Sequence, residues 1–431
     1  MEKPRILIVG TVPYSEKATS RAFAAYFTGW PREKLAQIFS STKTPPKGHC
    51  GTLYQITDQR LLKARIHRTM EVGTIFSYPN LPEEWMDNSR EVDSRLICKL
   101  YNLGRKKRPA TMLLRRWLWN PKYWCSAELN RWLDAFRPEC VFLSLSNDFF
   151  IQDIAMYAAQ RYGIPMVVSI GDDYYFNDQT SWSPLYHWYK RAYRASLDQV
   201  FARARRAVYI SDKIRDKYVA EFGLAGETVY LTSQVERRPF RPVGNPPVIS
   251  YFGNLKMGRN HSLDDIGRAL RAIHPRYCLD VYSNEQDPAY YRVLEGNPNI
   301  RFHGSVPYGE VKQRMTESDL VVIVEGFRPE DVAWSRYSLS TKAADALACG
   351  AQILAYGSKE CGVIEYMEAT RAAAVCTRRE DLPACIRHLL EDEAFQRRCY
   401  EQAVWVSAQH HTLARSTALF EKLVKEAMED V

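Results

Sequence analysis

The residues best suited to chemistry lie in the segment 337–356, YSLSTKAADALACGAQILAY. Ser340 is a good N-cap for a helix over residues 341–349, which a glycine then ends. Backbone N–H groups at such a helix start can hold a phosphate, and Lys342 adds a positive charge beside it. Asp345, one turn into the helix, can face the same ligand. The segment predicts an anion site, with an ordinary capped helix and a solvated lysine as the alternative.

Two adjacent carboxylates, Asp172 and Asp173, follow the apolar run 165–170 (PMVVSI), which is typical of a buried strand. A carboxylate just beyond a strand end can orient or deprotonate an acceptor hydroxyl. The same groups could instead cap the following segment or pair with a lysine. Both interpretations stay open.

A third candidate, the stretch 105–124 (RKKRPATMLLRRWLWNPKYW), mixes basic residues with tryptophans and leucines from Arg105 to Trp124. Lysine and arginine attract anionic lipid headgroups, and tryptophan prefers the membrane interface. The stretch is therefore a candidate anionic membrane surface. The alternative is a basic loop followed by a helix whose tryptophans and leucines face the core.

The elements that must position these residues alternate between strand-like and helix-like patterns in the first half of the chain. Buried strands separated by helices imply βαβ units and a parallel sheet. We expect strands over 5–9, 140–145, 165–170 and 207–210, and helices over 20–27, 150–162 and 184–203.

The pattern breaks at residues 237–247 (RRPFRPVGNPP), where four prolines and a glycine suggest an interdomain linker. The alternation then restarts, with strands expected over 248–252, 278–282, 300–302, 320–324 and 351–355. The sequence thus predicts an α/β fold of two doubly wound, Rossmann-like lobes facing a central cleft. We expect a first domain over 1–236, a second over 248–411, and a last helix over 412–431 that packs back on the first lobe.

Composition limits the class of protein. At 46% hydrophobic and 25% charged residues, the chain is of ordinary globular type, and no apolar run is long enough to span a membrane. We therefore expect a cytoplasmic protein, with peripheral membrane attachment as an option. The ten cysteines form no C-x-x-C pair, so neither a disulfide framework nor a metal site is predicted. The charge of +9 fits an anionic partner, but no nucleic-acid recognition module is visible.

The segment 337–356 resembles the donor-binding helix of family 4 glycosyltransferases. In that family an acid on this helix binds the ribose of the nucleotide, and the matching residue is Asp345. The resemblance implies donor contacts from Ser338, Ser340, Thr341 and Lys342. The family usually has a glutamate eight positions before the acid, where this chain has Tyr337. Glu325, on the loop after the expected strand 320–324, is a candidate to supply the nearby carboxylate.

A second match opens the second lobe at residues 251–260, YFGNLKMGRN. It resembles the family's strand–glycine loop, in which basic residues grip the diphosphate. Fixed cations stabilise the charge of a departing nucleoside diphosphate. Gly253 permits close backbone approach, and Arg259 stands at the family's lysine position. Asn254 replaces the usual arginine, with Lys256 as its substitute; a turn with surface basic residues is the alternative. The order of elements over 299–324 also follows the family, so the resemblance covers about 248–376.

This resemblance implies a GT-B glycosyltransferase that transfers a sugar, with retention and without a metal or cofactor, from a nucleoside-diphosphate-sugar. A saccharide or lipid-linked acceptor in cell-surface polysaccharide or glycoconjugate synthesis is expected. The first lobe of such enzymes holds the acceptor, so the loop after the first strand supplies the candidate contacts Gly10, Glu16, Lys17 and Arg21. Asp172, Asp173 and Glu325 are the candidate catalytic carboxylates.

Two other functions remain open from the sequence. One is a nucleotide-sugar epimerase, which has the same two-lobed fold but needs no acceptor. The other is a non-catalytic sugar-binding or membrane-binding protein that has kept the fold.

Overall fold

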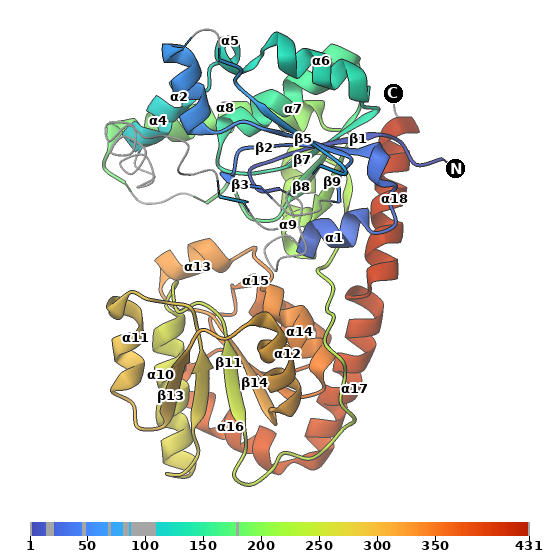
Figure 1. Ribbon diagram of the computed structural model, residues 1–431. Helices are drawn as coiled ribbons and strands as arrows, with labels where there is room; N and C mark the ends of the chain where they lie inside the picture. The colour runs from blue at the N-terminus through green and yellow to red at the C-terminus, as the bar shows by residue number, and fades with distance from the viewer. Residues whose placement is uncertain are drawn as a thin grey trace. The chain divides into compact units, whose positions relative to one another are not determined.

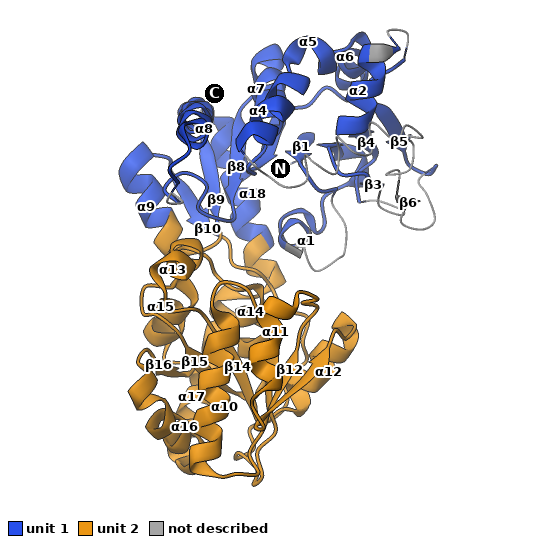
Figure 2. Ribbon diagram, turned by 90° about the vertical axis from the view of Figure 1, so that its left-hand side faces the viewer, with its two compact units in different colours: residues 1–209, 215–228, 417–431 blue, residues 210–214, 229–416 orange. Residues whose placement is uncertain are grey.

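The structure is a computed structural model that describes residues 2–13, 21–44, 49–67, 70–80, 86–87, 109–177 and 181–429. The chain divides into two compact units, coloured separately in Figure 2. The first unit comprises residues 1–209, 215–228 and 417–431, and the second comprises 210–214 and 229–416. Each unit has its own sheet, in which parallel pairing dominates, so the predicted α/β fold is confirmed at this level.

The first unit contains an eight-stranded sheet in the order β10-β9-β8-β7-β1-β2-β4-β5. All neighbouring strands in it are parallel except β4 and β5, which are antiparallel. The strands are β1 (Ile6–Gly10), β2 (Leu35–Phe39), β4 (Thr52–Gln55), β5 (Thr74–Ser77), β7 (Cys140–Ser144), β8 (Met166–Ile170), β9 (Arg206–Tyr209) and β10 (Gly226–Thr228). Two short strands, β3 (Lys43–Thr44) and β6 (Met86–Asp87), pair separately.

The first unit's helices include the long α7 (Phe149–Tyr162) and α8 (Pro184–Arg203) close to the predicted bounds (Figure 1). Gly163 ends α7 in the left-handed conformation, as a C-cap glycine should. The other helices are α1 (Arg21–Phe27), α2 (Asp58–Ile66), α4 (Pro109–Leu118), α5 (Pro121–Trp124), α6 (Ala127–Phe136), α9 (Asp212–Phe222) and α18 (Leu413–Glu429); the first residues of α9 and α18 belong to the second unit.

The second unit contains a six-stranded, fully parallel sheet in the order β13-β12-β11-β14-β15-β16. By position in the chain this is the doubly wound order 3-2-1-4-5-6, which reverses between β11 and β14. Ligands bind such sheets at the carboxyl ends of the strands flanking the reversal. The strands are β11 (Ile249–Phe252), β12 (Leu279–Tyr282), β13 (Ile300–Gly304), β14 (Leu320–Val324), β15 (Gln352–Tyr356) and β16 (Ala374–Cys376).

Helices cover both faces of the second unit's sheet (Figure 1). The buried strand β14 shows the division: Val321 and Ile323 pack in one core, whereas Leu320, Val322 and Val324 pack in the other. The first core includes residues of α12 (Tyr308–Glu317), α13 (Pro329–Ser335), α14 (Thr341–Cys349), α15 (Gly362–Thr370) and α17 (Glu393–His410). The second includes residues of α10 (Arg259–Ile273), α11 (Pro288–Glu295) and α16 (Leu382–Glu391).

Two further segments, the proline-rich segment 237–247 and helix α18, lie outside the sheets. The proline-rich segment 237–247 has neither helix nor strand, and it packs on the second unit, where Arg238 donates to the carbonyl oxygen of Ser318 at 2.8 Å. Helix α18 lies against the first unit from residue 417 onward. There Phe420 stacks on Tyr26 with 5.3 Å between ring centroids, and Arg206 Nε lies 3.1 Å from a Glu426 oxygen.

Candidate active site

The candidate donor site lies in the second unit, at the carboxyl ends of β11 and β14. Because the helices that follow parallel strands start at this edge, α10 and α15 begin there. Helix α14 precedes β15 and therefore also has its N-terminus at the same edge. Several helix N-termini, each the positive end of a helix dipole, thus collect where an anionic ligand would bind.

The loop after β11 is held in place by hydrogen bonds to its backbone. Gly253 N donates to the carbonyl oxygen of Tyr282 at 3.1 Å, and the Tyr251 hydroxyl donates to the carbonyl oxygen of Asn254 at 2.6 Å. Gly258, the N-cap of α10, has φ 72°, and a Cβ there would collide with Asp331 and Gly326. A glycine is therefore required for α10 to start beside the loop after β14.

Arg259, the first residue of α10, forms a buried ion pair with Glu325 after β14. Its Nε and Nη2 lie 3.1 Å and 2.9 Å from the two carboxylate oxygens, and Nη1 donates to Asn254 Oδ1 at 2.7 Å. The side chains are 12% and 3% exposed. A bidentate ion pair of this kind fixes the plane of the guanidinium as well as its position.

Burial and charge act in opposite directions on the pKa values of the two side chains. Burial raises the pKa of the Glu325 carboxyl, and the positive charge of Arg259 opposes that rise. Burial in turn lowers the pKa of Arg259, but the charge of Glu325, its hydrogen bonds with Arg259 and the nearby Tyr251 and Cys361 together outweigh burial, so the pKa of Arg259 rises. The result is a cation held at the strand edge with little exposure to water.

Helix α14 starts and ends where the sequence predicts. The Ser340 hydroxyl accepts from Lys342 N at 3.3 Å, as an N-cap does, and Gly350 has φ 88° at the C-cap. Thr341 and Lys342 are half-buried at this start. Ser338, in the preceding turn, donates from its hydroxyl to the carbonyl oxygen of Trp334 at 3.4 Å.

Asp345 is buried on α14, with 1% of its surface exposed. Its carboxylate accepts from the Ser233 hydroxyl at 2.8 Å and from the Tyr308 hydroxyl at 3.2 Å and 3.3 Å. The sequence does not suggest these two partners. Asp345 is thus surrounded by hydroxyl donors, the same kind of group that a ribose presents.

The remaining basic candidate of the loop, Lys256, differs from Arg259 in being exposed. Its Nζ lies 3.7 Å from a Glu285 carboxylate oxygen, and its side chain is 55% exposed. The Glu285 side chain is 9% exposed, so the pair is open to solvent on the lysine side only, and from there Lys256 can turn toward a ligand.

Two residues that the sequence did not point to connect the loops of the site. The Cys361 thiol lies 3.2 Å from the Ser335 hydroxyl and 3.9 Å from the carbonyl oxygen of Gly326. A Cβ on Gly362, the first residue of α15, would lie 2.9 Å from the carbonyl oxygen of Ser338. The start of α15 therefore packs between the loop after β14 and the turn before α14.

Tyr337 stands at the position of the family's usual glutamate and forms a hydrogen bond through its backbone. Its carbonyl oxygen accepts from the Ser211 hydroxyl at 3.0 Å, and Lys213 Nζ lies 6.0 Å from the centre of its ring. Lys213 also pairs with Glu365 at 2.5 Å.

In the first unit, Asp173 is bound to the chain that follows it. Its Oδ1 accepts from Tyr175 N at 3.2 Å, Phe176 N at 2.9 Å and the Tyr218 hydroxyl at 3.1 Å. Burial raises the pKa of Asp173, and these hydrogen bonds oppose the rise. Such bonds are those of a capping carboxylate, one of the two interpretations left open. The neighbouring Asp172 is exposed.

The other acceptor-side candidates are only partly described. Gly10 ends β1, whereas Glu16 and Lys17 lie outside the described residues, and for Arg21 only the backbone position at the start of α1 is described.

The basic, tryptophan-rich stretch contains both buried and exposed apolar side chains. Trp119 and Trp124 are buried, as the core interpretation expects, whereas Leu114 and Trp117 are 57% and 56% exposed. Residues 105–108 lie outside the described residues. No helix in the described part of the chain is both long and apolar enough to cross a bilayer.

Comparisons with known proteins identify the fold and family. Residues 64–233 match the model of a glycosyl transferase 4-like domain, and residues 261–421 match that of a glycosyl transferase-like domain. No curated protein matched the chain by sequence.

Solved structures match over the whole chain. Sucrose-phosphate synthase from Thermosynechococcus elongatus has a TM-score of 0.60 at 10% identity over 100% of both chains. HepE of Anabaena, solved in complex with UDP-glucose, has a TM-score of 0.60 at 12% identity, again over 100% of both. In its complex with UDP, HepE has a TM-score of 0.59 at 13% identity over 99% of this chain and 100% of that one. With both of its units matched, this chain belongs to the glycosyltransferases of GT-B fold with family 4-like domains.

Proposed function

We propose that this glycosyltransferase takes its sugar from a UDP-sugar bound to the second unit, at the carboxyl ends of β11 and β14. The observation that carries the proposal is the buried Arg259–Glu325 pair at the reversal of strand order, beside the capped start of α14. The likeness in fold to HepE, which was solved with UDP and with UDP-glucose, supports the choice of UDP as the nucleotide of the donor.

The diphosphate would be held by positive charge and by backbone N–H groups. Arg259 supplies the fixed cation, and Lys256 and Lys342 supply two further cations near the loop and the start of α14. The N-terminus of α14 adds N–H groups, the N-terminus of α10 adds the positive end of its helix dipole, and Ser338, Ser340 and Thr341 add hydroxyls. Such a preformed set stabilises the charge that develops on the leaving UDP without reorganising during the reaction.

The ribose would bind at Asp345. A ribose hydroxyl can replace the Tyr308 or Ser233 hydroxyl as the donor to this carboxylate, so its hydrogen bonding is kept when the donor binds. Burial of Asp345 strengthens such a bond, since water competes poorly there.

Glu325 would act mainly as a positioning residue. Both of its oxygens bind Arg259, and this geometry orients the guanidinium plane toward the loop after β11. For the acceptor we retain Asp172 and Asp173 as candidate carboxylates, with Gly10, Glu16, Lys17 and Arg21 as candidate contacts. Retention of configuration and independence of metal are parts of the same proposal.

The acceptor is proposed to be a hydroxyl of a saccharide or lipid-linked sugar in cell-surface polysaccharide or glycoconjugate synthesis. A lipid-linked acceptor would suit attachment to an anionic membrane through the stretch 105–124, where Leu114 and Trp117 are exposed. A cytoplasmic location goes with this proposal.

The test is a thermal-shift screen of the purified protein against UDP, GDP, dTDP, ADP and CMP. A ligand that binds only the folded state raises the melting temperature, so UDP should stabilise the wild type most. Arg259→Ala should abolish that shift, whereas the matched control Arg268→Ala should keep it. Arg268 lies on the same helix, with its side chain 72% exposed. No shift with any nucleotide would overturn the proposal.

Turnover separates the proposed activity from its alternatives. UDP release from a UDP-sugar that depends on an added saccharide acceptor indicates transfer. Conversion of the UDP-sugar into another UDP-sugar without acceptor would indicate an epimerase instead. UDP binding without turnover of any donor would indicate a binding protein.

A further inference from the structure

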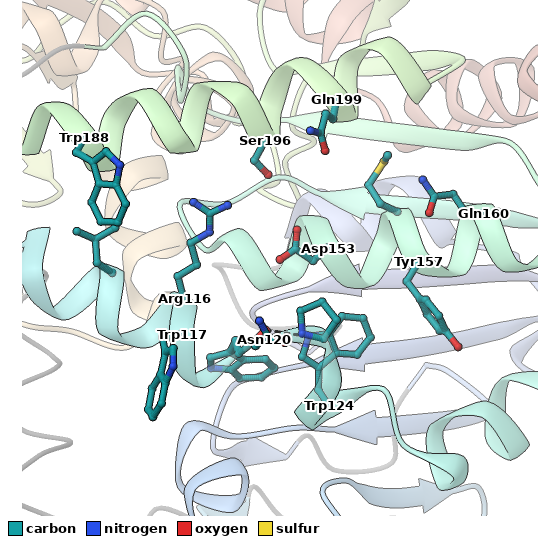
Figure 3. Close-up of a pocket in the computed structure, with 14 residues that line it drawn as sticks. Arg116, Trp117, Asn120, Trp124, Asp153, Tyr157, Gln160, Trp188, Ser196 and Gln199 are labelled. Atoms are coloured by element: carbon teal, nitrogen blue, oxygen red, sulfur yellow. Dashed lines mark hydrogen bonds between the residues drawn. The ribbon is translucent and has the colours of Figure 1, made fainter. Parts of the chain in front are cut away.

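A groove of about 670 Å³ lies on the first unit between helices α4, α5, α7 and α8, apart from the donor site of the second unit (Figure 3). Its volume falls within the usual range for small-molecule sites. It is lined by Leu113, Arg116, Trp117, Trp119, Asn120, Pro121, Trp124, Asp153, Met156, Tyr157, Gln160, Trp188, Ser196 and Gln199.

The groove is elongated along α7 and α8. Trp188 lies at one end, Tyr157 and Gln160 lie at the other, and Asp153 lies between them (Figure 3). Along α8 the lining extends from Trp188 to Gln199, which is about 16 Å at 1.5 Å per helical residue. The shape suits an extended ligand better than a compact one.

Aromatic side chains line both ends of the groove. Trp188 is 60% exposed, so its indole is available to a ligand. Trp124 and Tyr157 pack edge to face, with 5.6 Å between ring centroids, and are held rigid by hydrogen bonds. Trp124 Nε1 donates to the carbonyl oxygen of Trp119 at 3.0 Å, and the Tyr157 hydroxyl donates to Asn130 at 2.6 Å. Trp124 is fully buried and thus holds the half-buried ring of Tyr157 in place; a rigid aromatic ring of this kind binds apolar faces at a small entropic cost.

The polar lining is mixed rather than ionic. Gln160 and Gln199 are exposed, and each amide can both donate and accept hydrogen bonds. Asp153 has no hydrogen bond or ion pair to another residue in the described part of the chain, and the charge of the nearby Arg116 acts on it. Burial raises the pKa of Asp153 to about 6, against the effect of Arg116. One carboxyl and one guanidinium leave the groove without a strong net charge.

This combination excludes several ligand classes. An acyl chain would bury the Asp153 carboxyl and the two amides without hydrogen bonds, which is costly. A phosphate or nucleic acid would meet a carboxylate beside a single arginine. A cationic ligand would be repelled by Arg116. A neutral molecule with hydroxyls at its edges and apolar C–H faces meets none of these penalties.

We propose that this groove binds a neutral saccharide chain, with a sugar ring stacked on Trp188 and with Asp153, Gln160 and Gln199 hydrogen-bonded to its hydroxyls. The site is a binding site, not a second catalytic centre. It would hold a glycan on the first unit whether or not a donor is bound to the second. The proposal therefore does not rest on the proposed donor or on transfer.

The test is an oligosaccharide array of neutral, amino and acidic chains of three or more sugars, followed by calorimetry with the strongest binder. The wild type should bind neutral chains, and Trp188→Ala should weaken binding about tenfold or more, as for a buried tryptophan contact. Asp153→Asn should weaken it by a smaller factor. The matched control is Trp182→Ala, because Trp182 is 97% exposed and does not line the groove. It should bind as the wild type does.

Three outcomes would overturn the proposal. They are binding to no array member, binding that Trp188→Ala retains, and binding to vesicles containing anionic phosphatidylglycerol that both Trp182→Ala and Trp188→Ala reduce. The last would indicate a membrane surface instead. The UDP thermal shift serves as an independent readout. Trp188→Ala should keep it, so loss of saccharide binding with a normal UDP shift tests the groove alone. A missing UDP shift with saccharide binding intact counts only against the proposed donor.

Discussion

The two sheets reverse their strand order in the same way, but they carry different chemistry at the reversal. In the second unit the ends of β11 and β14 bring together Arg259 and Glu325 in a buried ion pair. In the first unit the ends of β1 and β7 bring together Gly10 and Ser144, where a Cβ on the glycine would lie 3.2 Å from that of the serine. Topology thus determines where a ligand can bind, whereas the residues at the strand ends determine which ligand. A fixed cation suits the second unit to an anion.

The largest expected effect comes from removing that cation. Arg259→Ala should lower kcat/KM by about 10²–10³, because a fixed charge on the leaving group is lost. It should also cost the second unit about 3–5 kcal/mol of stability, since Glu325 is left buried without a partner. Donor turnover and urea unfolding measure the two effects.

A double variant separates activity from stability. Arg259→Met with Glu325→Leu replaces the pair by apolar groups of similar size, which is often neutral for stability. We expect a melting temperature near that of the wild type and no UDP-induced shift. A double variant that still turns over donor would show that the pair is structural, and the contrast between the two reversals would lose its functional meaning.

Alanine variants at two helix-ending glycines, one in each unit, allow the packing of the two units to be compared. Gly163 after α7 and Gly350 after α14 both have positive φ, 63° and 88°, but their surroundings differ. A Cβ on Gly163 would meet nothing within 4 Å, whereas one on Gly350 would lie 2.6 Å from the carbonyl oxygen of Arg238. Gly163→Ala should therefore cost about 1 kcal/mol, for the backbone conformation alone, and Gly350→Ala about 3 kcal/mol.

Urea unfolding of the two glycine variants checks this difference. Equal losses would mean that the proline-rich segment containing Arg238 moves away easily from the end of α14. The packing of that segment on the second unit would then be looser than its hydrogen bonds suggest.

Much of this architecture could be predicted where the signal is local. The helix α14 has its cap at Ser340 and its stop at Gly350, both adjacent in sequence to the residues they affect, and the structure has the predicted bounds. The buried strand β14 is likewise an uninterrupted apolar run. By contrast, β5 exposes every second residue at the antiparallel edge of the first sheet, so its pattern was too weak to find.

The site was harder to predict because its contacts are distant in sequence. Arg259 and Glu325 are 66 residues apart, so the sequence suggested a cation and a carboxylate but not their pairing. Asp345 meets Ser233 across 112 residues for the same reason. Within the tryptophan-rich stretch, Trp119 is buried and stacks on Phe150 of α7 while Trp117 is exposed, and no local pattern contains that information.

The pH dependence of stability should have opposite sign in the two units. In the second unit His411 is buried, which lowers its pKa to about 4, against the effects of its bond to the Leu231 carbonyl oxygen and of Asp345. Its contribution is therefore fully present above pH 6.5 and is lost as the pH falls toward 4, because only the unfolded chain then takes up the proton. The loss is up to about 3 kcal/mol. His411→Gln should flatten this slope, as unfolding between pH 7 and 4.5 would measure; an unchanged slope would assign it to other groups.

The smallest expected effect is at Asp153 in the groove of the first unit. Burial raises its pKa to about 6, above the value of about 4 in an unfolded chain, so the folded state binds the proton more tightly. The carboxyl therefore favours folding at low pH, and this contribution is lost as the pH rises through 6. Because the side chain is partly exposed, Asp153→Asn should stabilise the protein by only about 1 kcal/mol at pH 7.5 and by almost nothing at pH 4. A stabilisation that does not depend on pH would mean that Asp153 titrates with the same pKa in the folded and the unfolded chain, and that its burial does not affect its protonation.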